Sequence, residues 1–473
     1  MTPKTAVVLL AAGPGTRMRS ALPKVLHAAA GRTLLDRTLA TARAVAADRP
    51  GSRVVVVTGP GDADPVRAHV KSTEPGALLA AQASPRGTGD ALRAAIPALG
   101  DATRVVVLPG DAPLVTAASV RRLLDEVDAR PDVPVAFLTA HLPDPSGYGR
   151  ILRDAHGIVV AVVEERDASE KEREIREANG GVYAFDRAFL DAALPRLEPT
   201  NAAGELYLTD LLAMAVESGR PARGVAAAAE EILGVNTRAD LARVEGILRA
   251  RAAAAAMEGG AALLRPETVT LDETVVLAPD TVVEPFVTLL GATTAGEGTR
   301  IGQGCVARDC VLGRNVTVKP YSVLEGARVG DGAVVGPFAR LREGTDLGPE
   351  VHVGNFVETK KAKLGRGAKA NHLTYLGDAV VGERTNVGAG VITCNYDGFA
   401  KHPTKIGKGV FVGSDVQLVA PVTVGDGAVI GAGTTVTKDV PADALATSRT
   451  PQRTVEGGGT AYRSRKAPAK KKG

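Results

Sequence analysis

The chain has 473 residues, which is too long for one ordinary hydrophobic core, so we expect two or three domains. It has 45% apolar and 23% charged residues, no apolar run long enough to span a membrane and no basic-then-apolar leader. These features predict a cytoplasmic globular protein with no membrane partner. The formal charge of +4 is misleading, because the last eleven residues hold six Lys or Arg and no acidic residue. A nucleic acid would have to bind that tail, but a solvated, disordered end explains its composition better. We therefore expect no nucleic-acid partner.

The first part of the chain alternates strand-like and helix-like segments. Short β-branched runs at 5–13, 53–59 and 104–111 each end on a glycine or turn signal. Helix-like segments at 33–47 and 89–99 follow two of these runs. This alternation predicts an α/β domain with a mostly parallel, Rossmann-like sheet and helices on both faces. Ligands of such sheets bind at the carboxyl ends of the strands, where the glycines stand.

A change of composition near residue 260 predicts the domain boundary. Residues 239–257 are rich in Ala, Leu and Arg and predict a connecting helix that Gly259 and Gly260 close. We therefore divide the chain into an N-terminal domain (1–236), a linker helix (237–260), a second domain (261–456) and a basic disordered tail (457–473).

The second domain carries an apolar residue at about every sixth position. Val306, Leu312, Val318 and Leu324 keep one phase, and the series from Ile406 to Val436 keeps another. Such a hexapeptide repeat predicts a left-handed parallel β-helix, in which each six-residue unit contributes one short strand and a turn and three units make one coil. An ordinary sandwich of short strands is the weaker alternative. Roughly nine coils are expected between Val269 and Val436, and a symmetric oligomer would cover their surfaces.

The segment LLAAGPGTRMRSALPKVLH, residues 9–27, has the features of a phosphate-binding turn. It lacks the Gly-Lys-Ser/Thr of a Walker loop and the third glycine of a dinucleotide fingerprint. Glycines let backbone amides approach phosphates, and Arg17 and Lys24 supply two cations of the kind a triphosphate needs. A glycine turn with solvated side chains explains the spacing equally well. Asp111 follows a strand and is either a metal ligand or a helix cap, and Asn236 could be a second, neutral oxygen ligand of Mg²⁺.

Several motifs in order extend this interpretation: LAAGPGTRM, PKVLH, GTG, GDAPL, GYGR, VVEERDAS and GVN. In this order they resemble the sugar nucleotidyltransferase family. The resemblance implies catalytic roles for Arg17 and Lys24 at the phosphates and Mg²⁺ held by Asp111 and Asn236. It also implies a site for UTP and the acetylated sugar nucleotide that is formed by Leu10, Ala11, Ala12, Gly13, Lys24, Gln82, Gly87, Thr88, Gly149, Glu164, Asn179 and Asn236.

The middle of the hexapeptide region contains several charged and polar residues. Arg342, Lys360 and Tyr375 could clamp a sugar phosphate, although a solvated charged face fits the same residues. His372 could take a proton from an amine near neutral pH, although an isolated histidine is more often structural. Between Thr393 and Ile406 the repeat gains an extra residue in the segment CNYDGFAKH, which predicts a bulging loop able to reach a ligand.

The motifs FARLR, HVGNFVE, HLTYLGD, NVGAGVITCNYDG and FVGSD resemble bifunctional members of the family that also transfer an acetyl group. The resemblance implies that His372 is the general base, oriented by Glu358, and that the loop completes a neighbour's site in a homotrimer. Glucosamine phosphate would then contact Arg342, Lys360, Tyr375 and Asn386. Acetyl-CoA would lie along Ala389, Asn395, Tyr396, Ser414, Ala432 and Arg449.

The resemblance implies synthesis of UDP-N-acetylglucosamine for cell-wall precursors: acetyl transfer from acetyl-CoA to glucosamine 1-phosphate, then uridylyl transfer from UTP. One alternative is a sugar-1-phosphate nucleotidyltransferase whose β-helix only oligomerises, and another is a non-enzymatic assembly protein of similar architecture. Four residues depart from the family pattern, at positions that usually carry His, Tyr, Thr and Tyr: Asp90, Pro109, Gly180 and Leu206.

Overall fold

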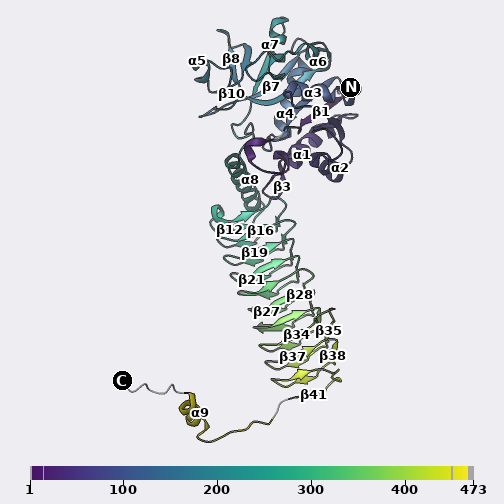
Figure 1. Cartoon of the computed structure of the whole chain (residues 1–473), viewed down its shortest axis with the longest axis vertical. Helices are drawn as coiled ribbons and strands as arrows, with labels where there is room; N and C mark the ends of the chain where they lie inside the picture. The colour runs from purple at the N-terminus through teal and green to yellow at the C-terminus, as the bar shows by residue number, and fades with distance from the viewer. Residues whose placement is uncertain (1–2, 14, 449–450, 467–473) are drawn as a thin grey trace, which may run out of the picture. The chain divides into compact units, whose positions relative to one another are not determined.

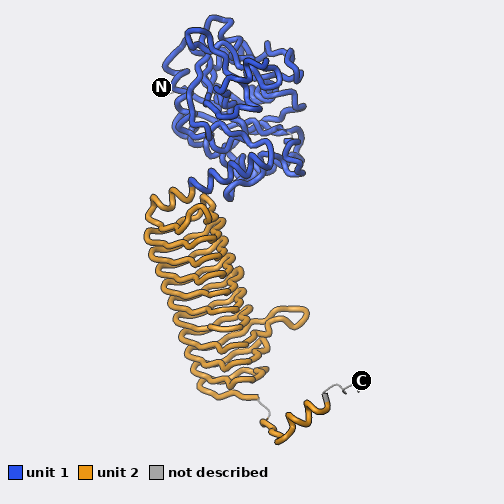
Figure 2. The backbone as a smooth tube through the Cα atoms, turned by 90° about the vertical axis from the view of Figure 1, so that its left-hand side faces the viewer, with its two compact units in different colours: residues 1–251 blue, residues 252–473 orange. Residues whose placement is uncertain are grey.

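The computed structural model describes residues 3–13, 15–448 and 451–466. It divides into two compact units, residues 1–251 and 252–473 (Figure 2), and each unit is described by itself. Within the described residues, no helix has both the length and the apolar character needed to cross a bilayer.

Unit 1 is built on a nine-stranded sheet. Four strands at one end are parallel to one another, and β10 then runs antiparallel to both of its neighbours β6 and β7. The prediction of an α/β domain is confirmed, but its sheet is mixed rather than mostly parallel, because four of the eight neighbouring strand pairs are antiparallel. The strand order is β5 (Leu78–Ala81), β4 (Arg53–Thr58), β1 (Thr5–Leu10), β6 (Arg104–Pro109), β10 (Glu177–Asp186), β7 (Val135–His141), β11 (Ala222–Ala226), β9 (Val159–Val163) and β8 (Arg150–Arg153).

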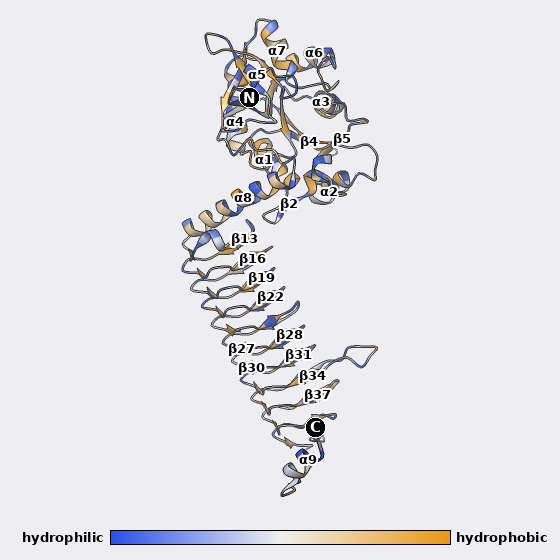
Figure 3. Cartoon of the chain, turned by 60° about the vertical axis from the view of Figure 1, so that its left-hand side comes forward, coloured by the Kyte–Doolittle hydropathy of each residue, from blue (hydrophilic) through white to orange (hydrophobic). Residues whose placement is uncertain are grey.

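Both faces of this sheet are buried, which is why its strands read as continuous apolar runs rather than alternating ones. In β1, Val7 and Leu9 face one core, whereas Ala6 and Val8 face the other. The first core is covered by α1 (Leu34–Ala47), α2 (Pro65–Thr73) and α4 (Ala117–Ala129). The second is covered by α3 (Thr88–Ala95), α6 (Arg187–Ala193) and α7 (Asp210–Glu217). Figures 1 and 3 show the helices around the apolar sheet.

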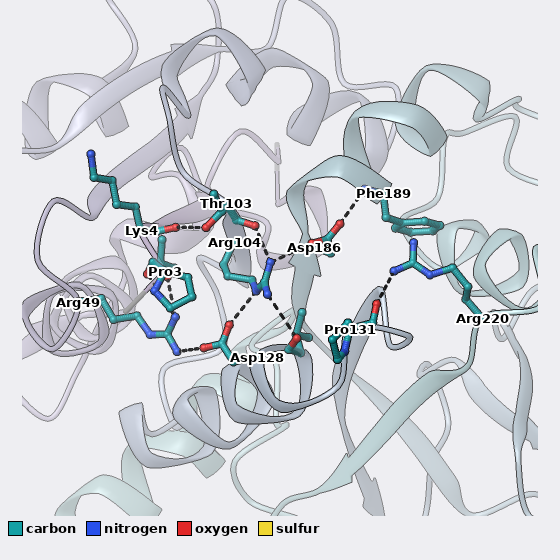
Figure 4. A network of polar contacts seen from close by, with 12 residues as sticks. Pro3, Lys4, Arg49, Thr103, Arg104, Asp128, Pro131, Asp186, Phe189 and Arg220 are labelled. Carbon is teal, nitrogen blue, oxygen red and sulfur yellow. Dashed lines mark hydrogen bonds and ion pairs between the residues drawn. The ribbon is translucent and has the colours of Figure 1, made fainter. Parts of the chain in front are cut away.

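A network of ion pairs ties the amino-terminal end of β6 to its neighbours (Figure 4). The Arg104 guanidinium donates to Asp128 of α4 at 2.8 Å and to Asp186 of β10 at 2.9 Å. Arg49 contacts the other oxygen of Asp128. These side chains are mostly buried, so the charges are screened less by water than those of a surface pair.

The connecting helix expected at 239–257 is α8, Arg238–Glu258. Val244 and Leu248 of α8 belong to a small core of unit 1, and Ala253 belongs to the core of unit 2. An Ala-rich sequence forms this helix readily, because Ala has the highest helix propensity of all residues.

Unit 2 is a stack of short coils with three parallel sheets along its sides. The sheets hold 11, 10 and 9 strands, and we name them sheets C, D and E. They run respectively from β12 (Ala262–Leu263) to β41 (Leu445–Ala446), from β13 (Thr270–Leu271) to β40 (Thr435–Val436), and from β14 (Val276–Leu277) to β38 (Val422–Val424). The predicted hexapeptide β-helix is confirmed, and it is about one coil longer than the expected nine.

The inward residue of most strands is aliphatic, as the period required, whereas Thr359 and Thr393 take this position in two strands. Leu312, Val318 and Leu324 are all buried. The prediction for Val306 is wrong: Ala307 is buried in its place, and Val306 is half-buried. The reason is that neighbouring turns differ by one residue in length, so inward positions follow one another after five or six residues.

The predicted disordered tail differs from the structure over part of its length. Residues Gly458–Lys466 form helix α9, which Ala461 and the following Arg side chains favour by their helix propensity. The basic residues from 467 onwards lie outside the described part of the chain.

Candidate active sites

A cavity of about 550 Å³ opens at the carboxyl ends of β1 and β6 in unit 1. This is the edge at which parallel sheets of this type bind ligands. Leu10 ends β1, the segment after it supplies Ala11, Ala12 and Gly13 to the cavity, and the loop after β6 supplies Asp111. Its lining includes every residue expected at the UTP and sugar site, namely Leu10, Ala11, Ala12, Gly13, Lys24, Gln82, Gly87, Thr88, Gly149, Glu164, Asn179 and Asn236.

The expected metal ligands and the expected cations meet in one cluster. The Lys24 ammonium contacts the Asp111 carboxylate and lies 2.9 Å from Asn236 Oδ1. Arg17 also donates to Asn236 Oδ1, at 2.8 Å. Gly15 makes this packing possible, because it has φ of 62° and a Cβ there would lie 2.5 Å from Lys24 Cβ.

The loop that precedes α3 is braced against the segment around Leu206. The Gly89 amide donates to Leu206 O at 2.8 Å, and the Leu208 amide donates to Thr88 Oγ1 at 3.1 Å. Gly87 adopts φ of 102°, and a Cβ there would lie 2.6 Å from Leu206 O. The loop therefore holds Gly87 and Thr88 against the cavity in one fixed conformation.

Glu164 and Asn179, which are expected to hold the sugar, also line the cavity. Burial raises the pKa of Glu164, and the Thr209 hydroxyl, which donates to it at 3.3 Å, opposes that rise. The Asn179 amide nitrogen donates to the Tyr183 hydroxyl at 2.7 Å, and its oxygen accepts from the Gly181 amide at 3.1 Å. Asn179 therefore has a fixed orientation before any ligand binds.

In unit 2, His372 lies at the corner between sheets C and D, at the end of β30 (Lys369–His372). It is exposed, and its Nδ1 lies 3.2 Å from Asn355 Oδ1. Asn355 ends β27 (His352–Asn355), and the two residues are direct partners in the strand register. Among the described residues, the contact of His372 is with Asn355 rather than with the expected Glu358, which pairs with Arg342 at 2.8 Å. An amide oxygen accepts, so in the neutral ring this contact favours the tautomer with the proton on Nδ1 and leaves Nε2 as the acceptor.

Three of the four residues expected to bind glucosamine phosphate lie on sheet D. The register sets Arg342 beside Lys360 of β28 (Glu358–Lys360), and Tyr375 begins β31 (Tyr375–Gly377) of the same sheet. Lys401 of the loop lies close enough to Lys360 to lower its pKa, and Arg342 lowers it further. Sheet D and the loop thus gather three cations. Asn386 begins β33 (Asn386–Val387) of sheet C and is not brought onto this face.

The residues expected along acetyl-CoA continue the corner that His372 occupies. The strand register puts Ala389, Ser414 and Ala432 on successive coils in the same column as His372. In the loop, Asn395 is buried and donates to Asp378 at 2.5 Å, whereas Tyr396 is exposed and its hydroxyl donates to Gly398 O at 2.6 Å. Asn395 therefore anchors the loop. Arg449 lies outside the described residues.

Comparisons with known proteins agree with this division of the chain. A family model of the MobA-like NTP transferase domain matches residues 7–179, and one of the bacterial transferase hexapeptide (six repeats) matches residues 403–438. The bifunctional protein GlmU of Sorangium cellulosum is 47% identical, over 100% of this chain and 99% of that protein. The bifunctional protein GlmU of Stutzerimonas stutzeri is 48% identical, over 95% of this chain and 98% of that protein.

The chain belongs to the GlmU family. It is therefore both a nucleotidyltransferase and a hexapeptide acetyltransferase. The prediction of a bifunctional uridyltransferase and acetyltransferase that makes UDP-N-acetylglucosamine is confirmed.

The residues that depart from the expected GlmU pattern fit their surroundings. A Cβ on Gly180 would lie 2.6 Å from Ile232 Cγ2, so Ile232 fills the space that a larger side chain would need. Leu206 is buried, and its backbone braces the loop of Gly87. Pro109 ends β6 beside Leu10 of β1.

Two residues of the GlmU acetyltransferase half were not assigned a role from the sequence. Asn355 precedes His372 by 17 residues, which is one coil, and this spacing was the available signal. Lys401 was noted only as part of the inserted loop, and nothing in the sequence indicated that the loop would bring it to Lys360.

Proposed function

We propose that the cavity of unit 1 transfers the uridylyl group of UTP to N-acetylglucosamine 1-phosphate, with release of pyrophosphate. The observation that carries this proposal is the convergence of all twelve expected nucleotide and sugar residues, together with Asp111, on one cavity. The alternative in which the β-helix only oligomerises has less support, because such a scaffold has no need of the cations around Lys360.

Mg²⁺ fits the oxygen pair of Asp111 and Asn236. One carboxylate and one neutral amide oxygen already meet around a single cation, the Lys24 ammonium. Mg²⁺ prefers oxygen ligands and usually takes few from the protein beside substrate phosphates. The described residues hold no group of three or more Cys, His, Asp and Glu side chains of the kind that binds other metals. When bound, the ion would neutralise charge on the phosphates.

The protein's part in uridylyl transfer is positioning and charge neutralisation. A phosphate oxygen of N-acetylglucosamine 1-phosphate attacks the α-phosphorus of UTP, and the bond to pyrophosphate breaks. Arg17 and Lys24 balance the charge of the leaving group. Glu164 and Asn179 hold the sugar so that its phosphate faces the nucleotide.

The corner around His372 would acetylate glucosamine 1-phosphate. Arg342, Lys360 and Lys401 hold the phosphate. His372 Nε2 takes a proton as the amine attacks the thioester carbonyl of acetyl-CoA, and the CoA thiolate leaves. Asn355 accepts from Nδ1–H and so holds the tautomer that this step needs.

A homotrimer would complete the acetyltransferase site. Tyr321, Phe338 and Phe356 stack on successive coils, with ring centroids 5.3 and 5.6 Å apart, although each ring is about half exposed. The inserted loop projects from the coils (Figure 2), and Phe399 at its tip is 97% exposed. Apolar surface of this kind is typical of a subunit interface. Light scattering behind size exclusion should give three times the chain mass, and a monomer would refute this part.

The experiment is a mass-spectrometric product assay with two substrate sets. The first holds glucosamine 1-phosphate, acetyl-CoA, UTP and Mg²⁺, and in the second N-acetylglucosamine 1-phosphate replaces the first two. UDP-N-acetylglucosamine should form in both. His372→Ala should abolish the product of the first set and spare that of the second. Product from the second set alone in the unaltered enzyme would favour the oligomerising β-helix instead.

A further inference from the structure

The side chain of Gln82 is buried at the wall of the nucleotide cavity, and both of its N–H groups are used. Its Nε2 donates to Gly87 O at 3.2 Å and to Asp90 Oδ2 at 2.9 Å. Gln82 is 5% exposed and Asp90 is 9% exposed, so water does not compete freely for either contact. A primary amide has two N–H donors, and these two acceptors occupy both of them.

Asp90 is itself held in place. It lies in the first turn of α3, where a carboxylate is favoured by the helix dipole, and Arg86 donates to its other oxygen at 3.1 Å. An ionised carboxylate can only accept hydrogen bonds. If the Gln82 amide turned over, Oε1 would face both Asp90 and Gly87 O, acceptor against acceptor, so only one orientation is stable.

We infer that Asp90 is a specificity-determining residue, because it fixes the Gln82 amide so that only the acceptor Oε1 is presented to the base. Gln82 lines the cavity, whereas Asp90 does not, so Asp90 acts through Gln82. Among the described residues, no hydrogen-bond donor contacts Oε1. This atom is therefore available to a ligand.

An acceptor at this point distinguishes uracil from cytosine. N3 of uracil carries a hydrogen and can donate to Oε1, whereas N3 of cytosine presents a lone pair. A buried polar group left facing another acceptor is costly, and sites built around such a group reject the wrong ligand strongly. The inference rests on the proposed uridylyl transfer and adds the residue that selects UTP over CTP.

The test compares kcat/KM for UTP and CTP, with N-acetylglucosamine 1-phosphate as the acceptor substrate. Asp90→Asn introduces an amide that can donate to Gln82 Oε1. The Gln82 amide can then turn over and present Nε2 to the base. Its UTP/CTP ratio should fall at least about tenfold, the effect of one lost hydrogen-bond preference. Asp90→Ala, which removes the acceptor altogether, is a second variant and should also lower the ratio.

Arg86→Gln is the matched control. It alters the other side of Asp90 and leaves the Asp90–Gln82 contact in place, so its ratio should stay within twofold of the unaltered enzyme. A merely structural role of Asp90 would lower both kcat/KM values together and leave the ratio unchanged, which would overturn the inference. No uridylyl transfer by the unaltered enzyme would instead refute the proposed function. The acetyltransferase rate of each preparation reports that unit 2 is intact.

Discussion

The hydrogen bond between Asn355 and His372 leads to a graded prediction for acetyl transfer. Asn355→Ala removes the acceptor that holds Nδ1–H, while His372 itself stays in place. A hydrogen bond of this kind contributes about 0.5–1.5 kcal/mol. This free energy favours one of the two neutral tautomers and one ring orientation. Its loss should therefore lower kcat by about two- to tenfold. Loss of the base itself, in His372→Ala, should cost about 10²- to 10⁴-fold.

The assay follows release of the CoA thiol with glucosamine 1-phosphate, and uridylyl transfer is measured on the same preparation. The uridylyl rate should not change, because Asn355 belongs to unit 2. An Asn355→Ala enzyme with an unchanged kcat would show that Asn355 does not orient the base.

Two further predictions concern unit 1. Thr209→Val removes the hydrogen bond that opposes the raised pKa of Glu164, so that pKa should rise further and the acid limb of kcat/KM for N-acetylglucosamine 1-phosphate should shift to higher pH. An unshifted limb in the pH profile would mean that ionised Glu164 is not needed for sugar binding. Asp128→Ala leaves the mostly buried Arg49 and Arg104 without this carboxylate and should lower the free energy of unfolding of unit 1 by about 1–3 kcal/mol. Urea titration followed by the helical circular dichroism signal measures this change, and an unaltered midpoint would contradict it.

The architecture was predictable because each half of the chain has a strong period. Buried parallel strands need continuous apolar runs, and a three-sided coil needs an aliphatic residue at about every sixth position. Where two coils differ in length by one residue, counting by sixes gives the wrong inward residue, as at Val306 and Ala307. The period gives the mean spacing of the residues that point into the prism, whereas the length of the turn between two strands decides which residue points inward.

That the residues expected at the nucleotide site share one cavity was predictable, because they stand in compact motifs and several of these motifs follow strand ends. The partner of His372 was not, because sequence separation is a poor guide to proximity in a coiled fold. Glu358 is closer in sequence to His372 than Asn355 is, yet Glu358 lies on sheet D beside Arg342. Asn355 and His372 are 17 residues apart, which is one coil here, so a residue one coil away is nearer in space than one on the next face.

Because the coils of unit 2 stack on one another, insertions and deletions in it are expected to span a whole coil. Every strand pairs in register with the strand one coil later, so removing a whole coil before Arg340 would join surfaces that already match and leave every later residue on its own face. Removing six residues between Tyr321 and Phe338 would instead rotate everything downstream by one face. His372, Ala389 and the cations of sheet D would rotate together and keep their mutual arrangement, but Phe338 would no longer stack on Tyr321, which lies before the deletion. Changes in length are therefore tolerated when they add or remove a whole coil, and the acetyltransferase half can be lengthened or shortened in this way.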